Sequence, residues 1–120
     1  MAQRIPPALE QEIQRFDVLR RENEALQITV ETLQNEVTEL TTTLEELQKQ
    51  PDDTTTYKNV GSIMFRVEKP KLAEELEDRK RTKELRLASM SKRLESSSQK
   101  LKELQAKIQI ELGKQDLKLQ

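Results

Sequence analysis

The first half of the chain carries apolar residues at alternating intervals of three and four positions, from Leu9 to Leu47. This spacing is typical of a helix that packs along a coiled-coil seam. Within that stretch, only Glu12 and Asn23 place polar side chains on the seam. The predicted seam consists of Leu9, Glu12, Phe16, Leu19, Asn23, Leu26, Val30, Leu33, Val37, Leu40, Leu44 and Leu47.

Prolines indicate where this first helix should begin and end. Pro6 and Pro7 fit only the first turn of a helix, because proline deeper in a helix removes a backbone hydrogen bond. Pro51 begins a cluster of aspartates and threonines that should end the helix. We therefore expect an N-terminal helix over residues 6–50.

A second helix is expected over residues 70–112, with Pro70 in its first turn and Gly113 as its stop, followed by a tail of residues 113–120. Its seam is less regular than the first, so residues 79–86 should pack loosely or shift register. The apolar seam positions are Ala73, Leu76, Leu87, Met90, Leu94, Leu101, Leu104 and Ile108, and the polar interruptions are Lys80, Lys83, Ser97 and Glu111.

Residues 54–69, between the two helices, have the alternating pattern of a β-hairpin. Apolar and polar side chains alternate from Ile63 to Val67, which is the period of a strand. A two-residue turn at Gly61-Ser62 would pair Val60 with Ile63, whereas a three-residue loop would pair Tyr57 with Phe65. The sequence leaves both registers open.

An isolated two-stranded hairpin is only marginally stable in water, and this chain has no third strand to add. One interpretation is a local turn at the end of a coiled coil. The other is that hairpins of several chains join into a shared sheet or barrel. The candidate oligomerisation residues are Tyr57, Val60, Gly61, Ile63, Met64, Phe65 and Val67.

The seam of the first helix would also suit a parallel two-stranded zipper, but charge favours an antiparallel pair within one chain. Seven Glu and no Lys or Arg lie between Glu22 and Glu46. Nine basic residues and two acidic residues lie between Arg79 and Lys102. A parallel homodimer would place like charges side by side, whereas an antiparallel hairpin places opposite charges together.

The composition excludes several classes of protein. The chain has 120 residues, of which 36% are charged and 2% aromatic, with a net charge of −1 and neither Cys nor His. The balanced charge gives no bulk attraction to nucleic acid or membrane. Without thiols, imidazoles or a phosphate-binding loop, we expect no enzyme, no cofactor and no metal site. No signal peptide or membrane span is evident, so we expect a cytoplasmic protein.

The stretches TYKNVGSIMFRVEK (56–69) and KLAEELEDRKRTKELRL (71–87) resemble those of β-class prefoldin subunits. The insert between the two helices resembles that of the β class because it holds a single hairpin, whereas α-class subunits carry a longer insert with two hairpins. The resemblance implies one prefoldin-like subunit over residues 1–120, mainly α, with a long antiparallel two-helix coiled coil joined by a central β-hairpin. It also implies a hetero-hexamer of two α-class and four β-class chains, whose hairpins form a β-barrel platform.

Members of that family capture non-native proteins at the coiled-coil tips and deliver them to a group II chaperonin without using ATP. The alternative is a coiled-coil scaffold or tether that binds no client. Off-seam apolar residues near both chain ends favour the chaperone, although ordinary fraying or packing against another chain would also explain them. The candidate tip residues are Ile5, Leu9, Ile13, Phe16, Ile108, Ile110, Leu112, Leu117 and Leu119.

Overall fold

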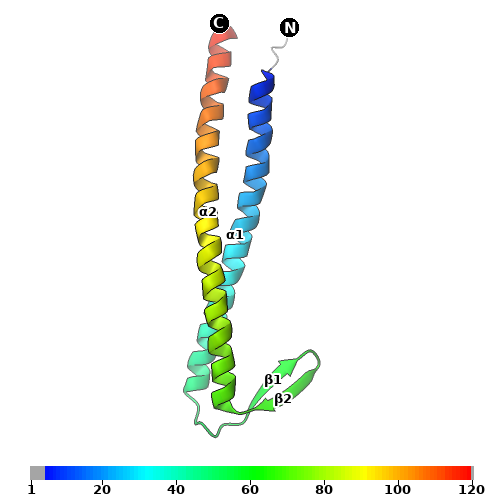
Figure 1. Cartoon of the computed structure of the whole chain (residues 1–120), viewed down its shortest axis with the longest axis vertical. Coiled ribbons are helices and arrows are strands. Elements are labelled where there is room, and N and C mark those ends of the chain that lie inside the picture. The colour runs from blue at the N-terminus through cyan, green and yellow to red at the C-terminus, as the bar shows by residue number, and fades with distance from the viewer. Residues whose placement is uncertain (1–4, 120) are drawn as a thin grey trace. The chain divides into compact units, whose positions relative to one another are not determined.

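The computed structural model describes the backbone of residues 5–119 and the side chains of residues 5–115. Helix α1 (Pro7–Gln48) is followed by strands β1 (Thr56–Val60) and β2 (Ile63–Val67), and then by helix α2 (Lys69–Leu119) (Figure 1). The predicted order of helix, hairpin and helix is confirmed, with the hairpin branching from the start of α2.

Helix α1 starts and ends close to the predicted prolines. Pro7 occupies its first turn, and the amide of Glu10 donates to the carbonyl of Pro6 over 3.0 Å. The last turn tightens before Pro51, since the amide of Gln50 donates to the carbonyl of Leu47, three residues back, over 3.1 Å.

Helix α2 does not stop at Gly113, so the predicted end at residue 112 and the separate tail from 113 are wrong. The helix continues through Gly113 to Leu119. Gly113 does not adopt a positive φ, the backbone conformation that ends many helices at glycine. One glycine inside a helix costs only about 1 kcal/mol relative to alanine. Its neighbours Leu112 and Lys114 are good helix formers, which offset that cost.

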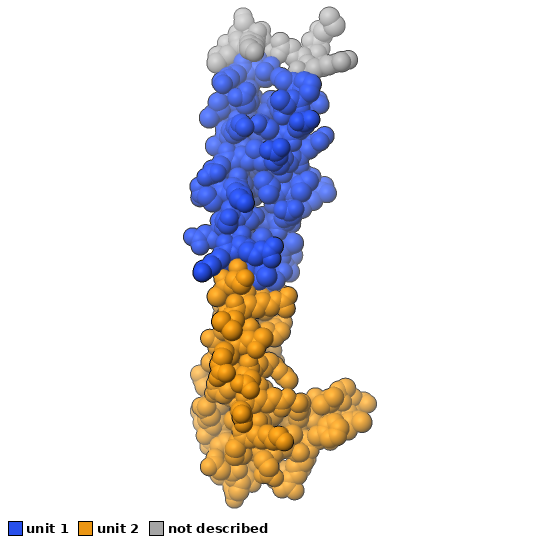
Figure 2. All heavy atoms as spheres, in the orientation of Figure 1, with its two compact units in different colours: residues 1–30, 90–120 blue, residues 31–89 orange. Residues whose placement is uncertain are grey.

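The chain divides into two compact units, each built from one segment of α1 and one of α2 (Figure 2). Unit 1 comprises residues 1–30 and 90–120, and unit 2 comprises residues 31–89 with the hairpin. The buried apolar residues are Leu9 and Ile108 in unit 1, and Leu33 and Leu44 in unit 2.

All predicted seam positions of α1 are buried or half-buried. In α2, the alternation of three and four positions continues from Leu76 to Glu111 and includes all four polar interruptions. The predicted shift of register between residues 79 and 86 is therefore absent, although Lys80 and Lys83 stay partly exposed.

Several polar seam residues meet polar partners on the opposite helix, which is compatible with a register that continues through them. In unit 1, Asn23 Nδ2 donates to the hydroxyls of Ser97 and Ser98 over 3.2 and 3.0 Å. Also in unit 1, Glu12 pairs with Lys107 at 2.8 Å. The earlier residue of α1, Glu12, meets the later residue of α2, Lys107, and the later Asn23 meets the earlier Ser97. This order confirms that the two helices pack antiparallel within one chain.

In unit 2, the Nζ of Lys83 lies 2.6 Å from an oxygen of Glu36. The contact is a close approach of charges rather than a well-aligned hydrogen bond. A lysine can bury its apolar stem along the seam while its ammonium group reaches the edge. The half-buried Lys83 is therefore compatible with a continuous seam.

Candidate functional site

The hairpin adopts the two-residue turn, which decides between the two registers that the sequence left open. Val60 pairs with Ile63, and Thr56 pairs with Val67 at the far end of the ladder. Gly61 has a φ of 61°, whereas Ser62 does not have a positive φ. A positive φ at only the first central residue is typical of a type II′ turn, which suits glycine there.

This register assigns each hairpin side chain to one of two faces, because directly opposed residues lie on the same face. We call one the helix-side face, since Lys58 on it pairs with Glu75 of α2, and the other the outer face. The helix-side face comprises Thr56, Lys58, Val60, Ile63, Phe65 and Val67, and the outer face comprises Tyr57, Asn59, Met64 and Arg66.

Most of the candidate oligomerisation residues are exposed. Five large apolar side chains are between 49% and 63% exposed, and Val67 is half-buried. Across residues 5–119, the sheet contains only β1 and β2, so no further strand covers either edge. The five exposed side chains are Tyr57, Val60, Ile63, Met64 and Phe65.

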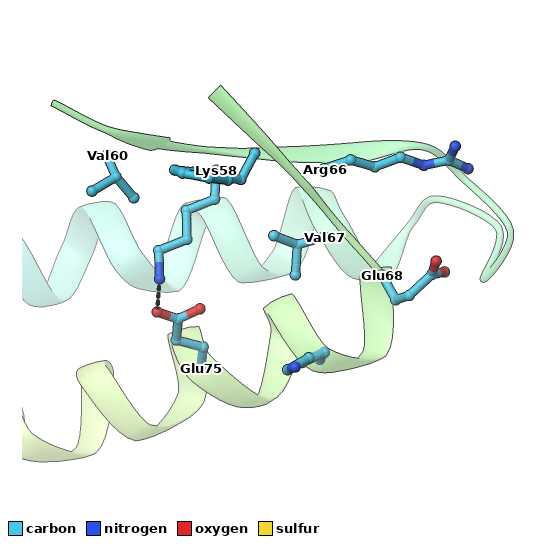
Figure 3. Close-up of a pocket in the computed structure, with 8 residues that line it drawn as sticks. Lys58, Val60, Arg66, Val67, Glu68 and Glu75 are labelled. Atoms are coloured by element: carbon cyan, nitrogen blue, oxygen red, sulfur yellow. Dashed lines mark hydrogen bonds and ion pairs between the residues drawn. The ribbon is translucent and has the colours of Figure 1, made fainter. Parts of the chain in front are cut away.

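A groove of about 630 Å³ lies between the helix-side face and the first turns of α2 (Figure 3). Val60, Phe65 and Val67 line it from the hairpin. Lys58 crosses the groove and donates a hydrogen bond to Glu75 Oε1. This hydrogen bond is the main cause that lowers the pKa of Glu75. The carboxylate therefore stays charged at pH values below those at which a glutamate usually takes up its proton.

A buried lysine also holds the base of the hairpin. Lys69 is 7% exposed, and its Nζ donates to the carbonyl of Gln50 over 2.6 Å and to Asp52 Oδ1 over 3.0 Å. The carbonyl end of a helix is partly negative, so an ammonium group at the end of α1 is favourable. Lys69 therefore connects the start of α2 to the chain just after the end of α1.

Lys58, Glu75 and Lys69 are not among the site residues that the sequence predicts. A signal for Lys58 existed only in one of the two registers, since the two-residue turn places this charged residue on the same face as Phe65. A charge on an otherwise apolar face needs a partner. Nothing in the local sequence indicates that Lys69 would meet residues 17 and 19 positions earlier.

The predicted tip residues in unit 1 separate into buried and exposed groups. Leu9 and Ile108 are buried between the helices, so neither side chain is accessible to a client in the packed chain, and their assignment to client binding stays a prediction. Ile13 and Phe16 are half-buried. The exposed members are Ile5, Ile110 and Leu112. The side chains of Leu117 and Leu119 lie outside the described residues.

Over the described residues, neither helix contains a stretch that is both long and apolar enough to cross a membrane.

Comparison with known proteins gives consistent matches over most of the chain. A family model described as "Prefoldin subunit" matches residues 10–115. A protein named "Prefoldin subunit beta" from Thermococcus gammatolerans is 36% identical over 110 residues, covering 92% of this chain and 94% of the relative. One of the same name from Methanosarcina acetivorans is 32% identical over 113 residues, covering 94% and 97%.

The fold is similar to a solved structure as well. The crystal structure of the prefoldin beta subunit from Thermococcus strain KS-1 matches with a TM-score of 0.81 and 30% sequence identity. The match covers 90% of this chain and 95% of that chain. The similarity therefore includes both helices and the hairpin between them.

Proposed function

The chain belongs to the prefoldin subunit family, a family of non-enzymatic chaperones, and from this premise we propose that it is a β-class subunit of a hetero-hexamer. The hexamer would contain two α-class and four β-class chains in the cytoplasm. It would hold non-native proteins at the helix ends of unit 1, without ATP, and deliver them to a group II chaperonin.

The exposed hairpin is the observation that carries the assembly part of this proposal. Its five large apolar side chains are 49–63% exposed in the single chain. Because each side chain is already about half covered, burying the rest of it contributes on the order of 1 kcal/mol. The unpaired strand edges can also accept further strands. Hairpins of neighbouring chains supply both the strands and the apolar surface that this hairpin lacks.

Phe65→Asp tests the assembly. The buried carboxylate would cost several kcal/mol at a subunit interface but little in the single chain, where Phe65 is half exposed. We expect native mass spectrometry of the chain co-expressed with an α-class subunit to show loss of the hexamer, with helical circular dichroism retained. Leu85→Asp is the matched control, because Leu85 is exposed on α2 away from the hairpin and should leave the hexamer intact. An intact Phe65→Asp hexamer would reject the assembly role of the hairpin.

Exposed apolar residues near the end of α2 support the client-binding part. Ile110 and Leu112 are exposed in unit 1, and Ile5 is exposed ahead of α1. Weak apolar contacts of this kind suit clients of varied sequence, and several linked sites raise the effective concentration of each. A modest contribution from each subunit can therefore give strong holding by the oligomer.

The double substitution Ile110→Ser and Leu112→Ser tests client binding. We expect the oligomer mass to be unchanged and the suppression of aggregation of a chemically denatured test protein to fall at least several-fold. Ile28→Ser is the control, since Ile28 is also exposed on a helix but far from these residues in the sequence. If the unsubstituted oligomer suppresses no aggregation at all, a scaffold without client binding becomes the better description.

A further inference from the structure

The hairpin joins α2 through a very short connection. Strand β2 ends at Val67 and α2 begins at Lys69, so only Glu68 lies between them. The carbonyl of Glu68 accepts a hydrogen bond from the amide of Leu72 over 2.9 Å, which ties that end of Glu68 to the first turn of α2. The dihedrals before this carbonyl stay soft, and a change in them swings the whole hairpin relative to α2. On its other side, β1 follows the loop of residues 49–55, which lies outside the helices and strands. The junction at Glu68 therefore acts as a hinge unless another contact restricts it.

The helix side of this hinge is held in place. Lys69 is buried, and its two hydrogen bonds connect the first residue of α2 to Gln50 and Asp52. The start of α2 is thereby attached to the chain that follows α1. What remains free to turn is the hairpin on the other side of Glu68.

One side-chain contact crosses the angle between hairpin and helix. Lys58 lies in the middle of β1, the strand that is not directly joined to α2, and Glu75 lies near the start of α2 (Figure 3). Among the side chains described for residues 5–115, this is the only ion pair or side-chain hydrogen bond between a strand and a helix. The hairpin and α2 diverge from the junction at Glu68, and the Lys58–Glu75 pair joins them at a distance from that junction. The pair therefore restricts the angle between hairpin and helix.

We propose that the Lys58–Glu75 pair is a positioning contact for assembly, which sets the angle at which the hairpin presents its apolar residues to the hairpins of neighbouring subunits. The inference rests on the proposed function, because it assumes that the hairpin is the assembly surface. A hairpin held at one angle loses less conformational freedom on joining its neighbours than one that swings about Glu68. The pair therefore acts on assembly without contacting the neighbouring subunit.

Spin-label distances measure this angle directly. The chain contains no Cys, so Ser62→Cys at the hairpin turn and Glu77→Cys on α2 can be labelled cleanly in the full chain. We expect a narrow distance distribution that broadens when Lys58→Met is added. Lys58→Arg, which keeps the charge, should restore the narrow distribution. The matched control is Lys71→Met, because Lys71 lines the same groove and its charge acts on Glu75 without a direct ion pair in the described part of the chain.

The consequence for assembly is measured by titrating each variant with an α-class subunit and recording the hexamer by native mass spectrometry. A partly exposed ion pair contributes modestly, so Lys58→Met should raise the concentration for half-assembly about 2- to 5-fold. Lys58→Arg and Lys71→Met should stay within experimental error of the unsubstituted chain.

The two proposals fail in different ways. A distance distribution as narrow in Lys58→Met as in the unsubstituted chain would overturn the positioning role. Broadening without any change in half-assembly would overturn it too, since the angle would then be irrelevant to the neighbouring subunits. Normal assembly of Phe65→Asp would instead refute the assembly role of the hairpin, whatever the spin labels report.

Discussion

Leu33 on α1 is 3% exposed, whereas Ile63 on β2 is 58% exposed, although the two side chains have the same number of carbon atoms. Both are regularly spaced apolar residues in regular secondary structure. Leu33 lies on a seam that α2 covers within the same chain. Ile63 lies on a sheet of two strands, to which the described residues add no third. The difference separates apolar residues that pack within one chain from apolar residues that, in the proposed assembly, pack against another chain.

The same contrast appears among the polar contacts. The buried amide of Asn23 bonds to two hydroxyls across the seam, so the contact lies within the packed helices. Lys58 contacts α2 across a groove, with no packed layer around the pair. We therefore expect the polar contacts in the seam to favour one pairing of the helices, and the contact at the hairpin to limit the angle between hairpin and helix.

The largest expected effect comes from comparing Leu33→Ala with Phe65→Ala in the isolated chain. Leu33→Ala leaves a cavity in the seam and should lower the free energy of unfolding by about 2–4 kcal/mol. Phe65→Ala should lower it by less than about 1 kcal/mol, because half of the side chain is already exposed. Urea denaturation followed by circular dichroism measures both, with Ile28→Ala as an exposed control. Equal losses at Leu33 and Phe65 would show that the hairpin is packed within one chain.

A smaller effect is expected from Asn23→Leu. The buried amide restricts which helix pairings leave its hydrogen bonds satisfied, and leucine would remove that restriction. We expect unchanged or higher thermal stability, together with dimers whose population rises with concentration in analytical ultracentrifugation. Gln34→Leu, an exposed change on the same helix, should leave the chain's association unchanged. A strictly monomeric Asn23→Leu chain would mean that the apolar seam alone determines the pairing.

The smallest effect concerns pH and the hairpin angle. The pKa of Glu75 is lowered in the folded chain, mainly by the hydrogen bond from Lys58. A lowered carboxyl pKa contributes stability above the unfolded pKa and loses it as the pH falls through the folded pKa. The spin-label distribution should therefore stay narrow through the usual glutamate range and broaden only below it. In Lys58→Met, the distribution should already be broad and should not change over that pH interval.

The helices were predictable because their signal is local and repeated. Alternation of three and four positions recurs along α1, and burial agrees at each of its predicted seam positions. Gly113 was wrong as a stop because a single residue carries a weak penalty, which the surrounding helix formers outweigh. The register at residues 79–86 was uncertain because Lys80 and Lys83 place charged residues where the seam pattern expects apolar ones. Its continuity depends on Glu36, which lies far away in the sequence.

The candidate site was predictable only in part. Alternation identified the hairpin and its apolar residues. The same sequence was compatible with turns of two different lengths, so the register stayed open. Leu9 and Ile108 were assigned to a binding surface, although they also occupy seam positions and are buried there. Periodicity had placed both residues on the side that faces the partner helix, so their position near the helix ends did not make them accessible.

The sequence by itself determined the order of the elements, the seams and the antiparallel pairing, since these follow from periodicity and charge along continuous segments. The tertiary structure decided the hairpin register, the face that it turns toward α2 and the lysines that hold it. The physical reason is distance along the chain: Lys58 meets Glu75, and Lys69 meets Gln50, only after a turn and a junction have set their angles. Those angles also determine which apolar side chains of the hairpin remain exposed.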